Sequence, residues 1–458
     1  MAGHNGSASR KRFHIVLVPG FGGFDALGKV EYYAGVTRLF QGWKAEKPVV
    51  LHYFDNYPTA AVVTRAARLR SYLAKRILRG ELLKGDDVIL VGHSTGGLDI
   101  RQLVSDLHDP ANDPVLADGG LEVDARTILD CVRRVVFLSV PHWGTNIADW
   151  VQSHPVWRRA VIAEMKAAFT GSQVYLLDQI EARIAGGAAW LTGAEVLLAV
   201  QDALTEANER CGEQGPLRTA EAREAASELG LYLDHMASDF HVIDDLTSQP
   251  RVEGPASPAH FDDAERRREL KRWKSIEVLS YATIGSCPFP FVPGSPAPVW
   301  DLAKLWTYPE IAKDAQLSAG TDLAYRLCYC ACAGGPFRPP ALGGNVTRRL
   351  GGAPLRPIEP WDNDGIVNTA SMLWPKSENV LVAGDHLDIV GHYRLIEALP
   401  AGGRQYRSYD PLKSVPPFSE QTFAEVWTEI FDFAVSGDTR SGARVRCPRK
   451  ELSLCGTS

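Results

Sequence analysis

Apolar positions follow two different spacings in the first third of the chain. Short runs are almost continuously apolar, which is typical of strands buried on both faces of a sheet, and the segments between them repeat apolar residues at helical spacing. Strands that alternate with helices in this order form a parallel sheet with helices on both faces. The predicted strands cover residues 13–18, 49–54, 87–92 and 133–141, and the predicted helices cover residues 60–79 and 98–107.

The pattern changes at residue 145, and up to about residue 270 the sequence is helical and charged without a strong strand pattern. One helix in this segment, over 193–209, places Val196, Leu197, Val200 and Leu204 on a single face. We therefore expect a helical cap inserted over the sheet. Later elements are strands at 275–284 and 379–384 and a helix at 420–435. The predicted division is 11–144 for the N-terminal part of the core, 145–270 for the cap, 271–435 for the C-terminal part with a Pro/Gly-rich irregular region, and 436–458 for a flexible tail.

Composition narrows the class of protein only a little. The chain has 458 residues, with 45% hydrophobic and 23% charged residues and a net charge of −6, so nothing global favours binding to nucleic acid. No apolar run reaches the length of about 18 residues that a transmembrane helix needs. As written, the sequence shows no signal peptide, which predicts a cytoplasmic protein unless it is exported by a route that the sequence does not reveal. Eight cysteines are too sparse for a disulfide framework, and we interpret the run CYCAC at 328–332 as small apolar residues in an extended segment.

A serine stands between the third predicted strand and the helix that follows it, in the sequence Gly92-His93-Ser94-Thr95-Gly96. This Gly-x-Ser-x-Gly spacing is typical of a strained turn at the end of a strand, where small flanking residues let strand and helix pass closely. Such a turn exposes the hydroxyl, so Ser94 is the candidate nucleophile. The backbone N–H of Thr95 is then a candidate donor to an oxyanion.

A serine nucleophile needs a general base and a group that orients the base. In a sheet of this kind the acid and then the histidine follow the serine along the chain. His386 comes just after the predicted strand 379–384, and Asp364 lies in an Asp-Gly loop upstream of it, with Asp362 as the alternative acid. A second oxyanion donor is expected in the glycine-rich loop after the first strand, where we select the N–H of Phe21.

Several of these stretches resemble the bacterial true lipases of the α/β-hydrolase fold, both the Pseudomonas-type and the Staphylococcus/Geobacillus-type enzymes. The chain departs from their pattern at Pro19-Gly20, where they carry His-Gly, and at Thr95, where they usually carry Met or Gln. The stretches that carry the resemblance are 16–35, 91–97, 138–149, 363–372 and 385–391.

The resemblance implies a serine carboxylic-ester hydrolase, a lipase or esterase of the α/β-hydrolase fold with a helical cap, that acts on lipid-like acyl esters. It implies Ser94 as nucleophile, Asp364 as acid, His386 as base, and Phe21 and Thr95 as oxyanion-hole donors. An apolar ester would be the partner, with transient contact to a lipid interface, and no cofactor would be required.

In the same family an acidic residue two positions after the catalytic histidine binds a structural Ca²⁺, and Asp388 stands at that position. A single carboxylate does not make a calcium site, so a hydrogen bond that stabilises the histidine loop is the alternative role for Asp388. The zinc ligands of the Staphylococcus/Geobacillus-type enzymes have no recognisable counterpart, and His235 and His241 are interpreted as ordinary polar residues.

Other functions stay open at this point. An acyltransferase or a polyester depolymerase would use the same three residues, and the difference lies in which group removes the acyl chain. A non-catalytic α/β-hydrolase that only binds a partner is a third hypothesis, and the intact order Ser94, Asp364, His386 disfavours it. The cap is either a mobile lid or a static helical elaboration.

Overall fold

The computed structural model describes most of the predicted core and parts of the predicted cap and irregular region. The described residues are 11–23, 26–27, 30–45, 47–117, 120–153, 239, 241–247, 257–286, 321–334, 337, 343–393, 396–398, 404–406, 412, 414 and 418–436.

The described strands and helices follow the predicted alternation. The strands are β1 (Phe13–Val18), β2 (Ala26–Leu27), β3 (Val30–Glu31), β4 (Val49–Tyr53), β5 (Asp87–His93), β6 (Val115–Leu116), β7 (Glu122–Val123), β8 (Val132–Leu138), β9 (Glu277–Ile284), β10 (Arg348–Leu350), β11 (Glu378–Ala383), β12 (Ile396–Ala398) and β13 (Arg404–Tyr406). The α-helices are α1 (Val36–Gly42), α2 (Val62–Leu78), α3 (Thr95–Asp106), α4 (Ala125–Cys131), α5 (Asn146–Ser153), α10 (Val242–Leu246), α11 (Asp263–Arg272), α14 (Thr321–Ala333) and α15 (Glu420–Val435). Short 3-10 helices are η1 (Pro110–Asn112), η5 (Pro258–His260), η6 (Trp273–Ser275), η7 (Thr369–Met372) and η8 (Asp388–Val390).

Seven strands form one sheet in the order β10-β11-β9-β8-β5-β1-β4. Every neighbouring pair in this sheet is parallel. The remaining strands form the two-stranded pairs β2-β3, β6-β7 and β12-β13. Because the large sheet is parallel, the turns that follow β5, β8, β9 and β11 lie along one edge of it, which is where ligands bind in open α/β sheets.

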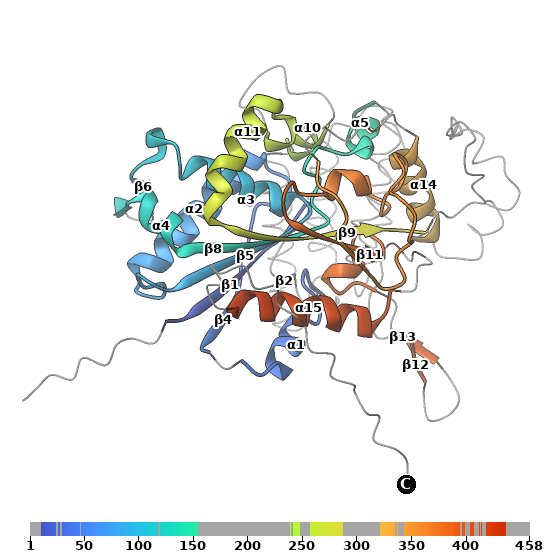
Figure 1. The fold of residues 1–458 in the computed structure, drawn as a ribbon, viewed down its shortest axis with the longest axis horizontal. Coiled ribbons are helices and arrows are strands. Elements are labelled where there is room, and N and C mark those ends of the chain that lie inside the picture. The colour runs from blue at the N-terminus through green and yellow to red at the C-terminus, as the bar shows by residue number, and fades with distance from the viewer. Residues whose placement is uncertain are drawn as a thin grey trace, which may run out of the picture.

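Helices bury both faces of this sheet, with α1 and α15 on one side and α2, α3 and α11 on the other (Figure 1). Successive residues of β1 alternate between the two sides. Ile15 and Leu17 pack in the cluster that contains Trp427 of α15, whereas Val16 and Val18 pack in the cluster that contains Leu69 of α2. A strand buried in this way needs apolar residues at every position, which explains the continuous apolar runs in the sequence.

One predicted element has the wrong conformation. Cys328, Cys330 and Cys332 are buried, but they lie in helix α14 and not in an extended segment. The stretch LCYCACA (327–333) has no polar face, so its pattern of apolar residues distinguishes poorly between a strand and a helix that is buried on several sides.

The structure describes residues 145–153, 239, 241–247 and 257–270 of the predicted cap. The end near 270 packs on the core, because Glu269 of α11 pairs with Arg101 of α3 at 2.7 Å between Oε2 and Nη2, with both side chains buried. Residues 154–238, including Val196, Leu197, Val200 and Leu204, lie outside the described residues, so the cap and the division of the chain stay predictions. In the described part of the chain, no helix has both the length and the apolar character needed to cross a bilayer.

Buried histidines predict that the fold weakens in acid. His14 of β1 and His52 of β4 form a hydrogen bond of 2.9 Å between Nδ1 and Nε2, and burial lowers the pKa of His52 to about 4. Burial also lowers the pKa values of His14, His93 and His142. An unfolded histidine takes up a proton below about pH 6.5, so between that pH and about pH 4 these four histidines bind more protons in the unfolded chain than in the folded chain.

We therefore expect the free energy of unfolding to be highest above about pH 6.5 and to fall as the pH drops toward 4, with His52 contributing roughly 1–3 kcal/mol of that fall. Urea unfolding followed by circular dichroism at pH 8, 6 and 4.5 measures this. The His52→Gln variant, which does not titrate, should lose less stability across the same interval. An equal loss in both proteins would contradict the assignment to His52.

Candidate active site

The predicted nucleophile lies in a strained turn between β5 and α3. Ser94 has φ 52° and ψ −129°, a conformation that non-glycine residues rarely adopt, and it is buried. Its N–H donates to the carbonyl oxygen of Leu138 at the end of the neighbouring strand β8, at 2.9 Å. A Cβ placed on Gly92 would lie 2.8 Å from the Cα of Gly97, so the strand and the helix leave no room for a side chain there. The strained serine turn predicted from the sequence is therefore present.

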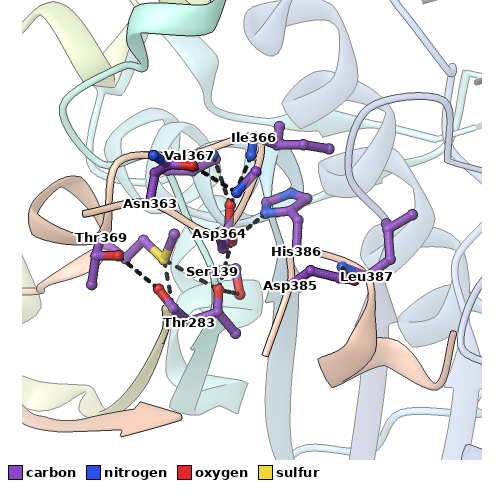
Figure 2. Close-up of polar contacts among 12 residues, drawn as sticks. Ser139, Thr283, Asn363, Asp364, Ile366, Val367, Thr369, Asp385, His386 and Leu387 are labelled. Atoms are coloured by element: carbon purple, nitrogen blue, oxygen red, sulfur yellow. Dashed lines mark hydrogen bonds and ion pairs between the residues drawn. The ribbon is translucent and has the colours of Figure 1, made fainter. Parts of the chain in front are cut away.

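Asp364 and His386 meet at the same edge of the sheet (Figure 2). His386 follows β11, and its Nδ1 lies 2.7 Å from Oδ2 of Asp364, with the two side chains 3% and 0% exposed. The backbone N–H of His386 also donates to the backbone carbonyl of Asp364 at 3.0 Å. Because a carboxylate can only accept, Nδ1 carries the proton and Nε2 of the neutral ring is left as an acceptor. This tautomer is the one that a general base requires.

The carboxylate of Asp364 is held by further donors. Its Oδ1 accepts the N–H groups of Ile366 and Val367 at 3.0 and 2.8 Å, and its Oδ2 accepts the hydroxyl of Thr283 at 2.6 Å (Figure 2). These hydrogen bonds fix the orientation of the Asp364 carboxylate.

Thr283 is in turn oriented by a residue of the neighbouring strand end. The hydroxyl oxygens of Ser139 and Thr283 lie 2.7 Å apart, and since Thr283 donates to Asp364, Ser139 is the donor in this pair. Ser139 itself has φ 51°, so a second strained serine stands at the end of β8. The acid is therefore supported from the ends of both β8 and β9.

The loop after β1 packs directly against the serine turn. A Cβ placed on Gly20 would lie 2.6 Å from the Cβ of Ser94, so only glycine allows this approach. The carbonyl oxygen of Gly20 accepts from Nη2 of Arg65 at 3.1 Å and from the N–H of Gly23 at 3.0 Å. The carbonyl and the following N–H of a trans peptide point in opposite directions. Arg65 thus fixes the direction of the Phe21 N–H, the predicted oxyanion donor.

Arg65 is fully buried together with its counter-ion. Its guanidinium binds both carboxylate oxygens of Asp99 at 2.9 to 3.1 Å and also donates to the carbonyl of Pro19 at 2.9 Å. Burial raises the pKa of Asp99 to about 6, against the opposing effects of Arg65 and Asn56, which favour the carboxylate. The ion pair of Arg65 and Asp99 holds the loop through the carbonyls of Pro19 and Gly20.

Asp362, the alternative acid, has a different partner. Its two carboxylate oxygens bind Nη1 and Nη2 of Arg356 at 2.6 and 2.7 Å, and its Oδ2 accepts the N–H of Glu359 at 2.7 Å. Of the two candidates, Asp364 is the one that contacts His386.

Asp388 forms a hydrogen bond within the histidine loop. Its Oδ2 accepts the N–H of Asp385 at 2.8 Å, and Oδ1 of Asp385 accepts the N–H groups of Leu387 and Asp388. A group of three or more metal-ligating side chains is absent from the residues that the structure describes. The contacts of Asp388 fit the hydrogen-bond role, and no step of the chemistry below uses a calcium ion.

Removing the Asp388 carboxylate should loosen this loop. We expect Asp388→Ala to lower the free energy of unfolding by about 1–3 kcal/mol, because the buried N–H of Asp385 loses its carboxylate acceptor. Thermal unfolding with and without EDTA separates the two roles. Under the hydrogen-bond role EDTA shifts the Tm of neither protein, whereas a calcium ligand would make the Tm of the unaltered protein fall on chelation and that of Asp388→Ala insensitive to it.

The site also contains residues that the sequence analysis did not single out. Thr283 stands near the carboxyl end of the predicted strand 275–284, and that position is a usable signal in an open α/β sheet. Arg65 has no such signal, since nothing in the sequence separates it from Arg68 and Arg70 on the same helix.

A parallel sheet of this strand order, with a strained serine between a strand and a helix and with an acid and a histidine that follow later in the chain, defines the α/β-hydrolase fold. The fold expected from the sequence is confirmed.

No protein-family model and no curated protein matches the chain. Solved structures with a similar chain path include a lipase from Staphylococcus hyicus, with 14% identity over 92% of this chain and 95% of that chain and a TM-score of 0.37. Lipase 1 from Pelosinus fermentans has 16% identity over 83% and 93% of the two chains, with a TM-score of 0.35. A mature lipase from Bacillus licheniformis has 13% identity over 85% and 90%, with a TM-score of 0.37.

Proposed function

We propose that this chain is a serine carboxylic-ester hydrolase that acts on lipid-like acyl esters through an acyl-enzyme on Ser94. The observation that carries the proposal is the buried pair of Asp364 and His386, at the same edge of the sheet as the strained Ser94. A carboxylate with four donors and a histidine with its Nδ1 proton fixed are the parts that activate a serine hydroxyl.

In the proposed reaction, Oγ of Ser94 attacks the carbonyl carbon of the ester while Nε2 of His386 takes the hydroxyl proton. The C=O π bond opens to an oxyanion, and the N–H groups of Phe21 and Thr95 stabilise it. As the intermediate collapses, the bond to the alcohol oxygen breaks, and His386 returns the proton to that oxygen. Water then attacks the acyl-enzyme with His386 again as base, which releases the carboxylic acid and restores Ser94.

The electrostatics of the site support these roles. The ring of His93 lies against the ring of His386 in a tilted arrangement, with centroids 4.7 Å apart, and burial keeps the pKa of His93 well below its usual value. A neutral neighbour adds no positive charge that would oppose protonation of His386 during the reaction.

A fluorophosphonate probe combined with an ester screen tests the proposal. We expect covalent labelling at Ser94, located by peptide mass spectrometry, and hydrolysis of p-nitrophenyl esters of increasing acyl length and of emulsified triglyceride. A chain that neither labels nor hydrolyses any of these esters would be a binding module. Faster release of p-nitrophenol on addition of an alcohol, with formation of the new ester, would instead favour an acyltransferase.

The oxyanion role of Phe21 gives a separate prediction. Phe21→Pro removes the N–H itself, and we expect kcat to fall by about 10²–10³-fold because one preorganised donor is lost. Phe21→Ala keeps the N–H and should stay within about threefold of the unaltered protein. Steady-state kinetics on a p-nitrophenyl ester measures both. Full activity in a folded Phe21→Pro variant would exclude this assignment.

The lipid-like substrate and the cap can be examined together by interfacial kinetics. A mobile lid over residues 145–270 predicts a sharp rise in hydrolysis when a short-chain triglyceride exceeds its solubility limit. Smooth saturation through that limit would favour a static esterase cap.

A further inference from the structure

A chain of buried hydrogen bonds connects the oxyanion loop to the histidine loop. The N–H of Gly20 lies 2.9 Å from the hydroxyl oxygen of Tyr32, and that oxygen lies 2.6 Å from Nδ1 of His93. On the other side of the ring, Nε2 of His93 lies 2.9 Å from the backbone carbonyl oxygen of His386. Tyr32 and His93 are 7% and 0% exposed. The side chains of Tyr32 and His93 thus connect the loop after β1 with the loop after β11.

The direction of each hydrogen bond in this chain is determined. The carbonyl of His386 can only accept, so Nε2 of His93 carries a proton. Burial keeps the ring neutral, which leaves Nδ1 as an acceptor for the hydroxyl proton of Tyr32. The oxygen of Tyr32 then accepts the N–H of Gly20. Since the donor and the acceptor of every link are fixed, the hydrogen-bond chain holds the two loops in one arrangement.

Both ends of this chain of hydrogen bonds lie next to reacting groups. The N–H of Gly20 is one peptide group before the N–H of Phe21, the proposed oxyanion donor. The carbonyl of His386 belongs to the residue whose Nε2 is the proposed base. Arg65 holds this loop from one side, through the carbonyl of Gly20, and Tyr32 holds it from the other, through the N–H of Gly20.

We propose that Tyr32 and His93 are positioning residues that set the oxyanion donor of Phe21 and the base of His386 at their working separation around Ser94. The inference rests on the proposed ester hydrolysis. A displacement of about 1 Å in such a site costs up to about 100-fold in rate, so the loss of either link should appear in kcat.

The neighbouring tyrosine provides a matched control. Tyr33 is 1% exposed, and its hydroxyl donates to the backbone carbonyl of Val18 at 2.6 Å and accepts from the backbone of His93, so Tyr33→Phe also removes buried hydrogen bonds but leaves the side-chain hydrogen bonds of Tyr32 and His93 intact. Tyr32→Phe keeps the ring and its packing against Tyr33 and His93. We expect comparable decreases in Tm for the two variants.

The test measures kcat and KM on a p-nitrophenyl ester, and the maximal rate of fluorophosphonate labelling, well below both Tm values. We expect Tyr32→Phe to lower kcat and the labelling rate by about 10- to 100-fold with KM within about threefold, and Tyr33→Phe to stay within about threefold in all three. Equal effects in the two variants would overturn the inference. Absence of hydrolysis and labelling in the unaltered protein would overturn the proposed function, and the inference with it.

Two substitutions at His93 break the hydrogen-bond chain at different links. They test the inference if Tyr32→Phe does not fold. Asn places an oxygen near the position of Nδ1 and loses the donor to His386, whereas Gln places an amide N–H near the position of Nε2 and loses the acceptor for Tyr32. We expect kcat to fall in both. Where Tyr32→Phe folds, the double variant Tyr32→Phe/His93→Gln should be no slower than the slower single variant, because both substitutions break the link between Tyr32 and His93. Multiplicative losses, or a kcat unchanged in both His93 variants, would contradict the shared chain.

Discussion

Replacing Ser94 with alanine is expected to lower kcat by about 10⁵–10⁶-fold, because the members of a catalytic triad act as a unit and the loss of the nucleophile removes nearly all of their contribution. His386→Ala should cost about as much. Steady-state hydrolysis of a p-nitrophenyl ester with purified variants measures the loss, and fluorophosphonate labelling of Ser94→Ala should be absent.

Circular dichroism and thermal unfolding provide the control for this experiment. Ser94→Ala removes only a hydroxyl, so the variant should keep its secondary structure and unfold at a Tm close to that of the unaltered protein. Retention of more than about 1% of kcat in a folded Ser94→Ala variant would mean that another residue is the nucleophile.

Asp364→Asn is expected to lower kcat by about 10⁴-fold, somewhat less than Ser94→Ala or His386→Ala. The N–H groups of Ile366 and Val367 require an acceptor at the position of Oδ1, so the amide oxygen of the new asparagine is held there. The amide nitrogen then faces Nδ1 of His386 and donates to it. The proton of the ring moves to Nε2, which can no longer accept the proton of Ser94.

Asp362→Asn is the matched control for this substitution. The two aspartates are two positions apart and both are buried, but Asp362 pairs with Arg356 and does not contact the histidine. We expect Asp362→Asn to lower Tm and to leave kcat within a few-fold of the unaltered protein. Near-normal activity of Asp364→Asn together with a large loss in Asp362→Asn would reverse the choice of acid.

The parts of this site that local sequence encodes were predictable. Ser94 stands in a motif whose spacing is dictated by the sterics of one turn. The order of an acid and then a histidine after it, together with the position of His386 directly after a predicted strand, selects His386 among the twelve histidines. The central strands were equally readable, because a strand buried on both faces must be apolar at every position.

The supporting residues were not predictable, because their roles depend on contacts between distant segments. Arg65 reaches the carbonyl of Gly20 only when α2 packs beside β1, and His93 reaches the carbonyl of His386 across 293 positions of sequence. A local pattern carries no record of such contacts. The prediction of an extended segment for the cysteine run at 328–332 was wrong for a different reason, because a segment without a polar face distinguishes strand from helix poorly.

The conformation of Ser94 also bears on how this chain tolerates mutational drift. A non-glycine residue held at a positive φ of this kind costs on the order of 1–3 kcal/mol, and glycine at position 94 would relieve most of it. Selection for thermal robustness alone would therefore favour loss of the hydroxyl, and laboratory evolution of this chain toward heat tolerance needs a screen for turnover at every round.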